Sequence, residues 1–316
     1  MADVDVLITG GAGFIGRALV DRCLRAGHAV TVIDNLCAGR LSNLEPFLDG
    51  ITFVEADILD AGRVDEVMAQ ARPALVFHLA AHHFIPFCNE HPQETLRVNV
   101  EGTHVVLSAA AAHGADVAVV ASSGAFYPSR DDPLREDLGA RPVDVYGLSK
   151  QMTEHTAEFI ANTTGMTCVA ARLFNTYGPY ETNPHIVPHI VECLRRGPLV
   201  ELGNIHTRRD YIYVEDVADL LLRCARGVDG GYTTVNVGTG VEYSAEQIVR
   251  LIEQALGTPV EIRVDDTRVR AVDKLHQRAD IARLEALTGT RPAHSLMEGL
   301  ERLLHHEQLL TPHAYA

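Results

Sequence analysis

Three polar residues between positions 123 and 150 have types and spacing that suit acid–base chemistry. Tyr146 and Lys150 are four residues apart in "VYGLSK", so on a helix both side chains leave the same face. A lysine ammonium beside a phenol lowers the pKa of the phenol and lets it act as a general base near neutral pH. Ser123 ends an apolar run in "VVASS" and could hydrogen-bond the same substrate hydroxyl. The set predicts a site that takes a proton from an alcohol.

The N-terminal stretch "VLITGGAGFIGRAL" predicts the cofactor for such chemistry. After an apolar run, Gly10 permits a sharp turn, Gly13 lets backbone approach a pyrophosphate, and Gly16 lets the next helix pack close to a sheet. The start of that helix presents free N–H groups to the anion. Asp34 in "VTVIDN" could accept hydrogen bonds from an adenosine ribose and would repel a 2′-phosphate, which favours NAD over NADP. Asp57 in "EADI" could contact the adenine.

Strands and helices that could position these residues alternate through the first half of the chain. Helical patterns cover 14–26, 62–71, 93–113 and 145–164, between apolar runs at 4–8, 29–33, 51–54, 74–79, 117–121 and 167–173. The apolar runs show no alternation of inward and outward residues, which is typical of strands covered on both faces in a parallel sheet. The fold class is therefore predicted to be α/β, with a Rossmann-type doubly wound parallel sheet.

The pattern of predicted elements changes after about residue 175, where prolines and glycines divide the chain into shorter segments. We predict an NAD-binding Rossmann domain over 1–174, to which later segments return. Residues 175–316 are predicted to form mainly a smaller C-terminal α/β substrate-binding region.

Composition narrows the possible partners. The chain has 316 residues, is 47% apolar and carries a formal net charge of −15, which argues against nucleic acid or an anionic membrane as a partner. No apolar run approaches the ~20 residues of a membrane span, and no basic leader precedes the first strand. The six cysteines include no CxxC pair, so we expect reduced thiols, no metal site and a cytoplasmic location.

An ordered set of motifs resembles the extended short-chain dehydrogenase/reductase family, in its nucleotide-sugar epimerase and dehydratase group. The resemblance covers nearly the whole chain. It rests on "TGGAGFIG" at 9–16, "FHLAA" at 77–81, "NVEGT" at 99–103, "YGLSK" at 146–150, "ARLFNTYGP" at 171–179 and "RRDYIYVEDVAD" at 208–219.

The resemblance implies roles for individual residues. Tyr146 would be the base, Lys150 its partner and the anchor of the nicotinamide ribose, and Ser123 a ligand of the substrate hydroxyl. The residues expected to bind the cofactor, besides Tyr146 and Lys150, are Gly10, Gly13, Phe14, Ile15, Gly16, Asp34, Asn35, Asp57, Ile58, Leu79, Ala80, Ala81 and Asn99. The residues expected to bind a nucleotide-sugar substrate, besides Ser123, are His83, Asn175, Arg209 and Arg270. The two arginines suit a diphosphate.

Two positions separate the reactions that this group performs. Dehydratases of the group carry an Asp–Glu pair directly after the serine position, where this chain has Gly124 and Ala125. Without further acid and base groups, what remains is oxidation at C4, rotation of the 4-keto sugar and return of hydride to its other face. We therefore predict an NAD-dependent 4-epimerase. The alternatives are a 4,6-dehydratase, a reductase or a decarboxylase. A non-catalytic NAD-binding module is disfavoured because Tyr146 and Lys150 are both present.

Other segments depart from the family pattern or add to it. The stretch "AAHHFIPFCNEHP" at 80–92 should border the sugar, and His83 is its candidate for substrate contact, although a histidine there more often only packs. Tyr180 stands where arginine is common, and the loop after it adds His185 and His189. These changes leave the sugar and the base open. The helical segments 93–113 and 145–164 resemble those that pair in relatives, which implies a homodimer.

Overall fold

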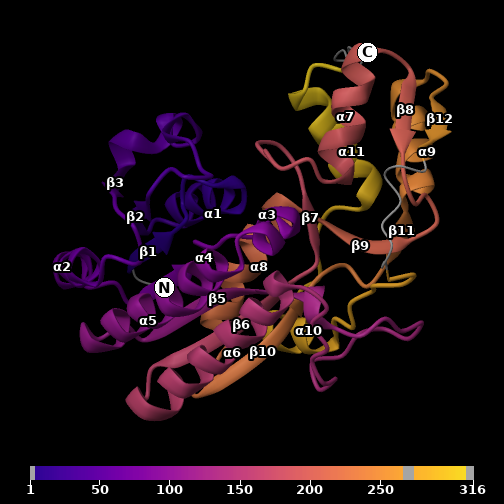
Figure 1. The fold of residues 1–316 in the computed structure, drawn as a ribbon. Coiled ribbons are helices and arrows are strands. Elements are labelled where there is room, and N and C mark those ends of the chain that lie inside the picture. Colours follow the sequence, from indigo (N-terminus) through magenta and orange to yellow (C-terminus); the bar gives the residue numbers. More distant parts are fainter. Residues whose placement is uncertain (1–3, 266–273, 311–316) are drawn as a thin grey trace.

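The structure is a computed structural model that describes residues 4–265 and 274–310. Its main strands are β1 (Asp5–Thr9), β2 (Ala29–Asp34), β3 (Ile51–Glu55), β4 (Leu75–His78), β5 (Val117–Ser123), β6 (Thr167–Leu173) and β10 (Tyr232–Val237). They form one seven-stranded sheet in the order β10–β6–β5–β4–β1–β2–β3 (Figure 1). Every neighbouring pair runs parallel. The predicted Rossmann-type sheet is confirmed.

Helices cover both faces of this sheet. One layer comprises α1 (Phe14–Arg25), α8 (Val214–Arg226) and α10 (Ala282–Thr288), and the other comprises α2 (Ala61–Ala71), α5 (Gly102–Ala112) and α6 (Val145–Thr164). Within β1, Val6 and Ile8 pack into the first layer, whereas Leu7 packs into the second. Both faces of the strand are therefore buried, which explains why its sequence is continuously apolar.

The helix predicted over 93–113 is divided into three parts. After the short helix α3 (Ile85–Glu90), α4 spans Pro92–Leu96, a π-helical turn covers Arg97–Glu101, and α5 follows. Single π-helical turns inside helices occur frequently at functional sites. Short 3₁₀ turns cover Leu41–Asn43, Glu45–Gly50 and Gly124–Phe126.

A second lobe lies beyond the carboxyl ends of the central strands (Figure 1). Its strands are β7 (Asn175–Tyr177), β8 (Leu199–Leu202), β9 (Arg208–Tyr213), β11 (Glu242–Ser244) and β12 (Glu261–Val264). Its helices are α7 (Ile186–Arg196), α9 (Ala245–Leu256) and α11 (Leu296–His306). Their apolar faces share one core that includes Ile190, Ile248 and Leu300.

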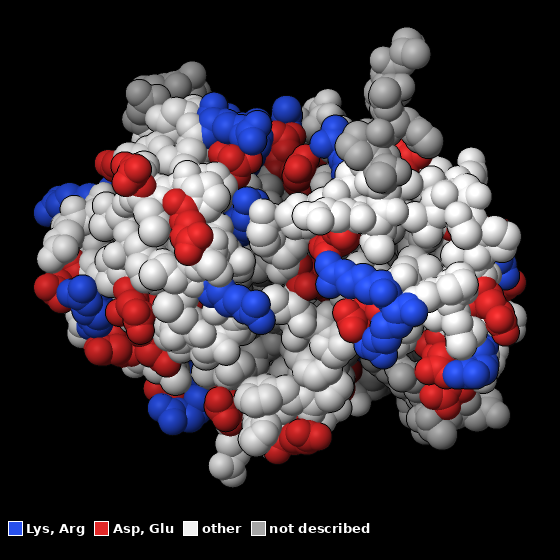
Figure 2. All heavy atoms as spheres, turned by 90° about the horizontal axis from the view of Figure 1, so that it is seen from above, with Lys and Arg blue, Asp and Glu red and all other residues white. Residues whose placement is uncertain are grey.

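Segments after residue 175 also build the Rossmann domain. β10 completes one edge of its sheet, and α8 and α10 pack on one of its faces. The boundary between 1–174 and 175–316, with these returning segments, is our proposal for the domain organisation. In the described ranges no helix is long and apolar enough to cross a membrane. Figure 2 shows acidic and basic side chains interspersed over the face seen from above.

Candidate active site

One cavity of about 1210 Å³ brings together nearly all the residues singled out in the sequence. A ligand pocket for one drug-sized molecule is typically ~300–1,000 Å³, so this cavity has room for a larger ligand set. The predicted residues that line it are Gly10, Gly13, Phe14, Ile15, Gly16, Asp34, Asn35, Asp57, Ile58, Leu79, Ala80, Ala81, His83, Ser123, Tyr146, Lys150, Asn175 and Arg209.

The glycine loop at one end of the cavity has no space for side chains. Gly10 has a φ of +75°, and a Cβ there would lie 2.7 Å from the backbone nitrogen of Ala80. A Cβ on Gly16 would lie 2.1 Å from the carbonyl oxygen of Gly10. Glycine is therefore required at both positions by the close approach of backbone segments.

The first turn of α1 faces the cavity with its N–H groups. Gly13 is the N-cap, no side chain caps the helix, and no acidic residue lies in its first turn. Gly13, Phe14, Ile15 and Gly16 all line the cavity. Unsatisfied N–H groups and the helix dipole make such a terminus a binding place for an anion. The loop therefore fits the pyrophosphate of a dinucleotide.

Two carboxylates follow neighbouring strands at the same edge of the sheet. Asp34 accepts hydrogen bonds from the backbone N–H groups of Ala12 and Leu36, at 2.9 and 2.8 Å. Burial raises the pKa of Asp34, and the two backbone hydrogen bonds oppose that change. Asp57 accepts hydrogen bonds from the side-chain amide of Asn35 at 3.0 Å and from the backbone N–H of Leu59 at 2.8 Å. Both carboxylates are thus held in place in the lining of the cavity, and their contact with an adenosine stays a prediction.

The proposed catalytic residues meet at the carboxyl end of β5. Ser123 is the last residue of that strand, and Tyr146 and Lys150 lie one turn apart on α6. The side chain of Asp144 caps α6 by accepting a hydrogen bond from the N–H of Gly147 at 2.7 Å. The side chain of Ser123 lies near enough to the phenol of Tyr146 to lower its pKa. The ammonium of Lys150 donates to the carbonyl oxygen of Ala121 at 2.8 Å.

Burial opposes ionisation of the phenol of Tyr146, an effect that its spacing from Lys150 does not reveal. Burial raises the pKa of Tyr146 to about 12, although the side chain of Ser123 acts in the other direction. The nitrogen of Lys150 lies 5.9 Å from the centre of the Tyr146 ring, and burial lowers the pKa of Lys150 to about 8. Desolvation therefore dominates the pKa of Tyr146, and a positive charge bound close to the ring would lower it.

The two residues after Ser123, Gly124 and Ala125, are enclosed by side chains from distant segments. This group of residues is called the closed floor below. A Cβ on Gly124 would lie 3.3 Å from both Gln277 Nε2 and the ring of Phe174. Gln277 Nε2 donates to the carbonyl oxygen of Gly124 at 2.7 Å. Lys274 Nζ donates to the carbonyl oxygen of Ala125 at 2.6 Å. A side chain at the first position would require Gln277 or Phe174 to shift by a few tenths of an ångström.

Sequence reasoning missed cavity-lining residues that come from distant segments of the chain. Lys274 and Gln277 line the cavity, but neither belongs to a recognisable motif. Glu181 also lines it, and only its place beside His185 in "YETNPH" offered a signal.

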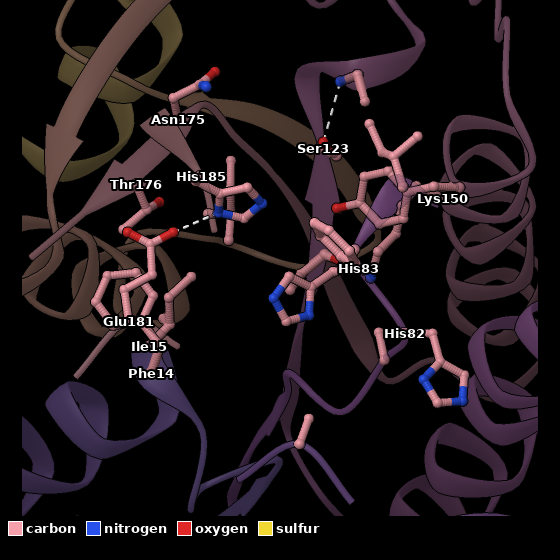
Figure 3. Close-up of a pocket in the computed structure, with 18 of the residues that line it drawn as sticks. Phe14, Ile15, His82, His83, Ser123, Lys150, Asn175, Thr176, Glu181 and His185 are labelled. Atoms are coloured by element: carbon pink, nitrogen blue, oxygen red, sulfur yellow. Dashed lines mark hydrogen bonds and ion pairs between the residues drawn. The ribbon is translucent and has the colours of Figure 1, made fainter. Parts of the chain in front are cut away.

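The substrate-side predictions have different outcomes. Arg209 lines the cavity, and its guanidinium donates to the carbonyl oxygens of Arg208 and Lys274, both at 2.7 Å. Asn175 is exposed at its far wall (Figure 3). His83 borders the cavity near Lys150 (Figure 3). Arg270 lies outside the described residues.

Asn99 lies directly behind the cavity lining, and its expected contact with the cofactor stays a prediction. Its side chain is buried and bonds the backbone N–H and carbonyl of His82, both at 2.8 Å. The amide also donates to Ser149 Oγ at 2.9 Å. All of its polar groups are thereby occupied, so Asn99 ties the segment after β4 to α6 and supports the cavity wall. Among the described residues, no group of three or more His, Cys, Asp or Glu could hold a metal ion.

Comparisons with known proteins agree with this geometry. Residues 6–238 match the model of the NAD dependent epimerase/dehydratase family. A UDP-glucose 4-epimerase of Mycolicibacterium smegmatis is 34% identical over 305 residues, covering 94% of this chain and 96% of the relative. The structure of the Thermotoga maritima UDP-glucose 4-epimerase with UDP-glucose has a TM-score of 0.89 and 29% identity, and covers 96% of this chain and 98% of the relative. The Thermus thermophilus UDP-glucose 4-epimerase in complex with NAD has a TM-score of 0.86 and 30% identity, and covers 96% and 98%.

The fold and the cavity thus define a dinucleotide-dependent enzyme of the α/β class. The chain belongs to the NAD dependent epimerase/dehydratase family, which confirms the resemblance seen in its motifs.

Proposed function

We propose that the protein is an NAD-dependent nucleotide-sugar 4-epimerase. The observation that carries the proposal is the Ser123–Tyr146–Lys150 set above a closed floor at Gly124. The two positions after Ser123 carry no carboxylate for the removal of water, which disfavours the alternatives of a 4,6-dehydratase and a decarboxylase. The relatives from Mycolicibacterium smegmatis and Thermotoga maritima, both named UDP-glucose 4-epimerases, support the same activity.

The residues present fit NAD. The uncapped start of α1 suits its pyrophosphate, and the fixed carboxylate of Asp34 suits an unphosphorylated ribose. When bound, NAD would supply a reversible hydride acceptor for C4 of the sugar and a positive charge that favours ionisation of the phenol of Tyr146.

Tyr146 moves the proton in both directions. In the proposed reaction its phenolate takes the proton of the C4 hydroxyl, while Ser123 holds the same oxygen by a hydrogen bond. After the keto sugar has turned, Tyr146 gives the proton back to the C4 oxygen. No net proton or hydride is lost, so one tyrosine serves as base and acid. Arg209, Arg270 and Asn175 are proposed to hold the nucleotide diphosphate and keep it fixed as the sugar turns.

A panel of nucleotide sugars tests the proposed function. The purified protein, loaded with NAD, is incubated with uridine and thymidine diphosphate sugars, and the products are separated by chromatography. We expect at least one pair of C4 epimers to be interconverted from both sides without net NADH. Formation of a 4-keto-6-deoxy sugar or of a pentose as the only product would contradict the proposal.

NAD affinity should depend on pH because of Lys150. Burial lowers the pKa of Lys150 to about 8, so its ammonium is present at roughly pH 7 and is lost as the pH rises through about 8. A charge-assisted hydrogen bond contributes about 1.5 kcal/mol or more. We therefore expect the Kd for NAD, measured by calorimetry, to rise about tenfold between roughly pH 7 and pH 9.5. Lys150→Met should bind weakly at both values, and a Kd of the native protein that does not change with pH would exclude this role.

We also propose that the protein is a homodimer formed through α5 and α6. On α6, Leu148, Met152 and Phe159 are 41%, 39% and 58% exposed, and their spacing places them on one stripe. Ala109 and Ala110 of α5 pack inward against the sheet instead. We expect light scattering to give the mass of two chains. Phe159→Glu should shift the mass toward one chain, and a monomeric native protein would refute the interface.

The six unpaired cysteines support a cytoplasmic location.

A further inference from the structure

The loop between β7 and α7 carries polar side chains into the part of the cavity where the sugar would lie. Glu181 and His185 come from this loop and line the cavity. The loop is tied to the Rossmann domain at two points. Outside the cavity, the guanidinium of Arg17 on α1 lies 3.8 Å from the centre of the Tyr180 ring. At the edge of the cavity, Asn183 Nδ2 lies 2.7 Å from His83 Nε2.

Glu181 and His185 form a carboxylate–imidazole pair. The carboxylate of Glu181 bonds to His185 Nδ1, as the dashed line in Figure 3 shows. The Glu181 side chain is only 4% exposed, whereas the His185 side chain is 42% exposed. The buried carboxylate therefore fixes the ring through Nδ1, and this contact determines that Nε2 is the nitrogen offered to a ligand.

Burial of the Glu181 carboxylate costs free energy of folding, which indicates that this side chain has a function in the site. Burial raises the pKa of its carboxyl, and the contact with His185 only partly opposes that change. Its second oxygen, Oε2, is buried and has no hydrogen-bond partner among the described residues. Unsatisfied buried polar atoms are rare in native proteins and call for a functional explanation. Here the explanation is the orientation of His185.

A second imidazole faces His185 from the other domain. The ring centres of His83 and His185 lie 6.4 Å apart, and the ring of Phe84 lies 6.2 Å from His185. The side chain of His83 is exposed and lines the cavity. Figure 3 shows His185 between Glu181 and the side of the cavity that carries Ser123, His83 and Lys150.

The proposed reaction creates a need that this pair can meet. A 4-epimerase must keep a keto sugar bound while the ring turns over, because an escaped intermediate would leave the cofactor reduced. With Nδ1 held by Glu181, His185 Nε2 accepts a hydrogen bond when the ring is neutral and donates one when it is protonated, so it can serve both orientations of the sugar.

We propose that Glu181 and His185 act as a positioning dyad, in which Glu181 orients the imidazole and His185 Nε2 hydrogen-bonds a hydroxyl of the turning sugar. The dyad retains the keto intermediate and leaves proton transfer to Tyr146. This inference rests on the proposed epimerase activity.

The test measures loss of the intermediate as well as rate. The native protein and its variants are given the epimer pair that the native protein converts. We record kcat, KM, the absorbance of reduced nicotinamide and the released keto sugar, trapped with an aminooxy reagent. For His185→Ala we expect kcat to fall about tenfold, as for the loss of one hydrogen bond. The number of turnovers that an enzyme molecule completes before it is left with reduced cofactor and becomes inactive should fall by a similar factor.

Matched variants separate positioning from a structural role. His185→Gln keeps a hydrogen-bonding group near the Nε2 position and should restore part of the retention. Glu181→Leu should leak the keto sugar, whereas Glu181→Gln, which can still accept from His185, should leak less. His305→Ala changes an exposed histidine of α11 outside the cavity and should behave as native. Melting temperature and NAD affinity show that each variant is folded.

The outcomes of this test are distinct. Unchanged keto-sugar release in both His185→Ala and Glu181→Leu, measured on folded protein, would overturn the dyad while leaving the epimerase intact. A reduced rate without leakage, and without rescue by His185→Gln, would also overturn it. Failure of the native protein to convert any epimer pair would overturn the proposed function, and the dyad with it.

Discussion

Tyr146→Phe is expected to lower kcat by about 10²–10⁴-fold, the usual contribution of a general acid–base residue. The substitution removes one oxygen from a residue that the structure places against Ser123 and beside Lys150. Because phenylalanine keeps the ring, the cavity wall should be preserved and NAD should remain bound. The measurement is epimer conversion at saturating substrate, together with the Kd for NAD.

Tyr243→Phe provides the matched control. Tyr243 lies on β11 and does not line the cavity, so the loss of its hydroxyl should leave kcat within about twofold, because substitutions remote from a site seldom alter it. Tyr146→Phe with more than about one-tenth of native kcat would exclude a general-base role. Tyr146→Phe that has lost NAD would instead show that the phenol helps to hold the cofactor.

Arg172→Met is expected to give the largest loss of stability, about 3–5 kcal/mol of the free energy of unfolding, because it leaves a buried carboxylate unpaired. Arg172 on β6 holds both carboxylate oxygens of Glu154 on α6, each at 2.8 Å. Both side chains are less than one-tenth exposed. Ser122 donates to the same carboxylate at 2.5 Å.

The network also supports the active site, because its members are neighbours of the proposed catalytic residues in the chain. Ser122 precedes Ser123 on β5, and Glu154 lies one helical turn after Lys150 on α6. Arg172 additionally donates to the hydroxyl of Tyr127 at 2.6 Å. We therefore expect Arg172→Met to reduce activity in the fraction of protein that still folds.

Two further variants test the stability argument by chemical denaturation. The double substitution Arg172→Met with Glu154→Leu removes the unpaired charge and should recover much of the loss. Arg63→Met breaks an ion pair with Glu66 whose side chains are 42% and 53% exposed, and it should cost about 0–1 kcal/mol. A single Arg172→Met variant that loses less than about 1 kcal/mol would contradict the assignment of a buried, interdependent pair.

Local sequence patterns determined the sheet and the cofactor end of the cavity. Strands buried on both faces are continuously apolar, so β1 to β6 could be placed within a few residues. The glycine loop could be predicted because its requirement is local: Gly10 and Gly16 lie in one short turn where backbone segments touch. The spacing of Tyr146 and Lys150 likewise follows from one helical turn.

The tertiary structure alone decided the features that depend on distant contacts. The side-chain amide of Asn99 hydrogen-bonds His82 and Ser149, and only the packing of α6 against the segment after β4 could reveal these contacts. The pKa of Tyr146 depends on burial, which the four-residue spacing from Lys150 does not encode. The floor under Ser123 and the pair formed by Glu181 and His185 depend on how the second lobe returns over the strand ends. Such contacts join residues far apart in sequence, so no local pattern could predict them.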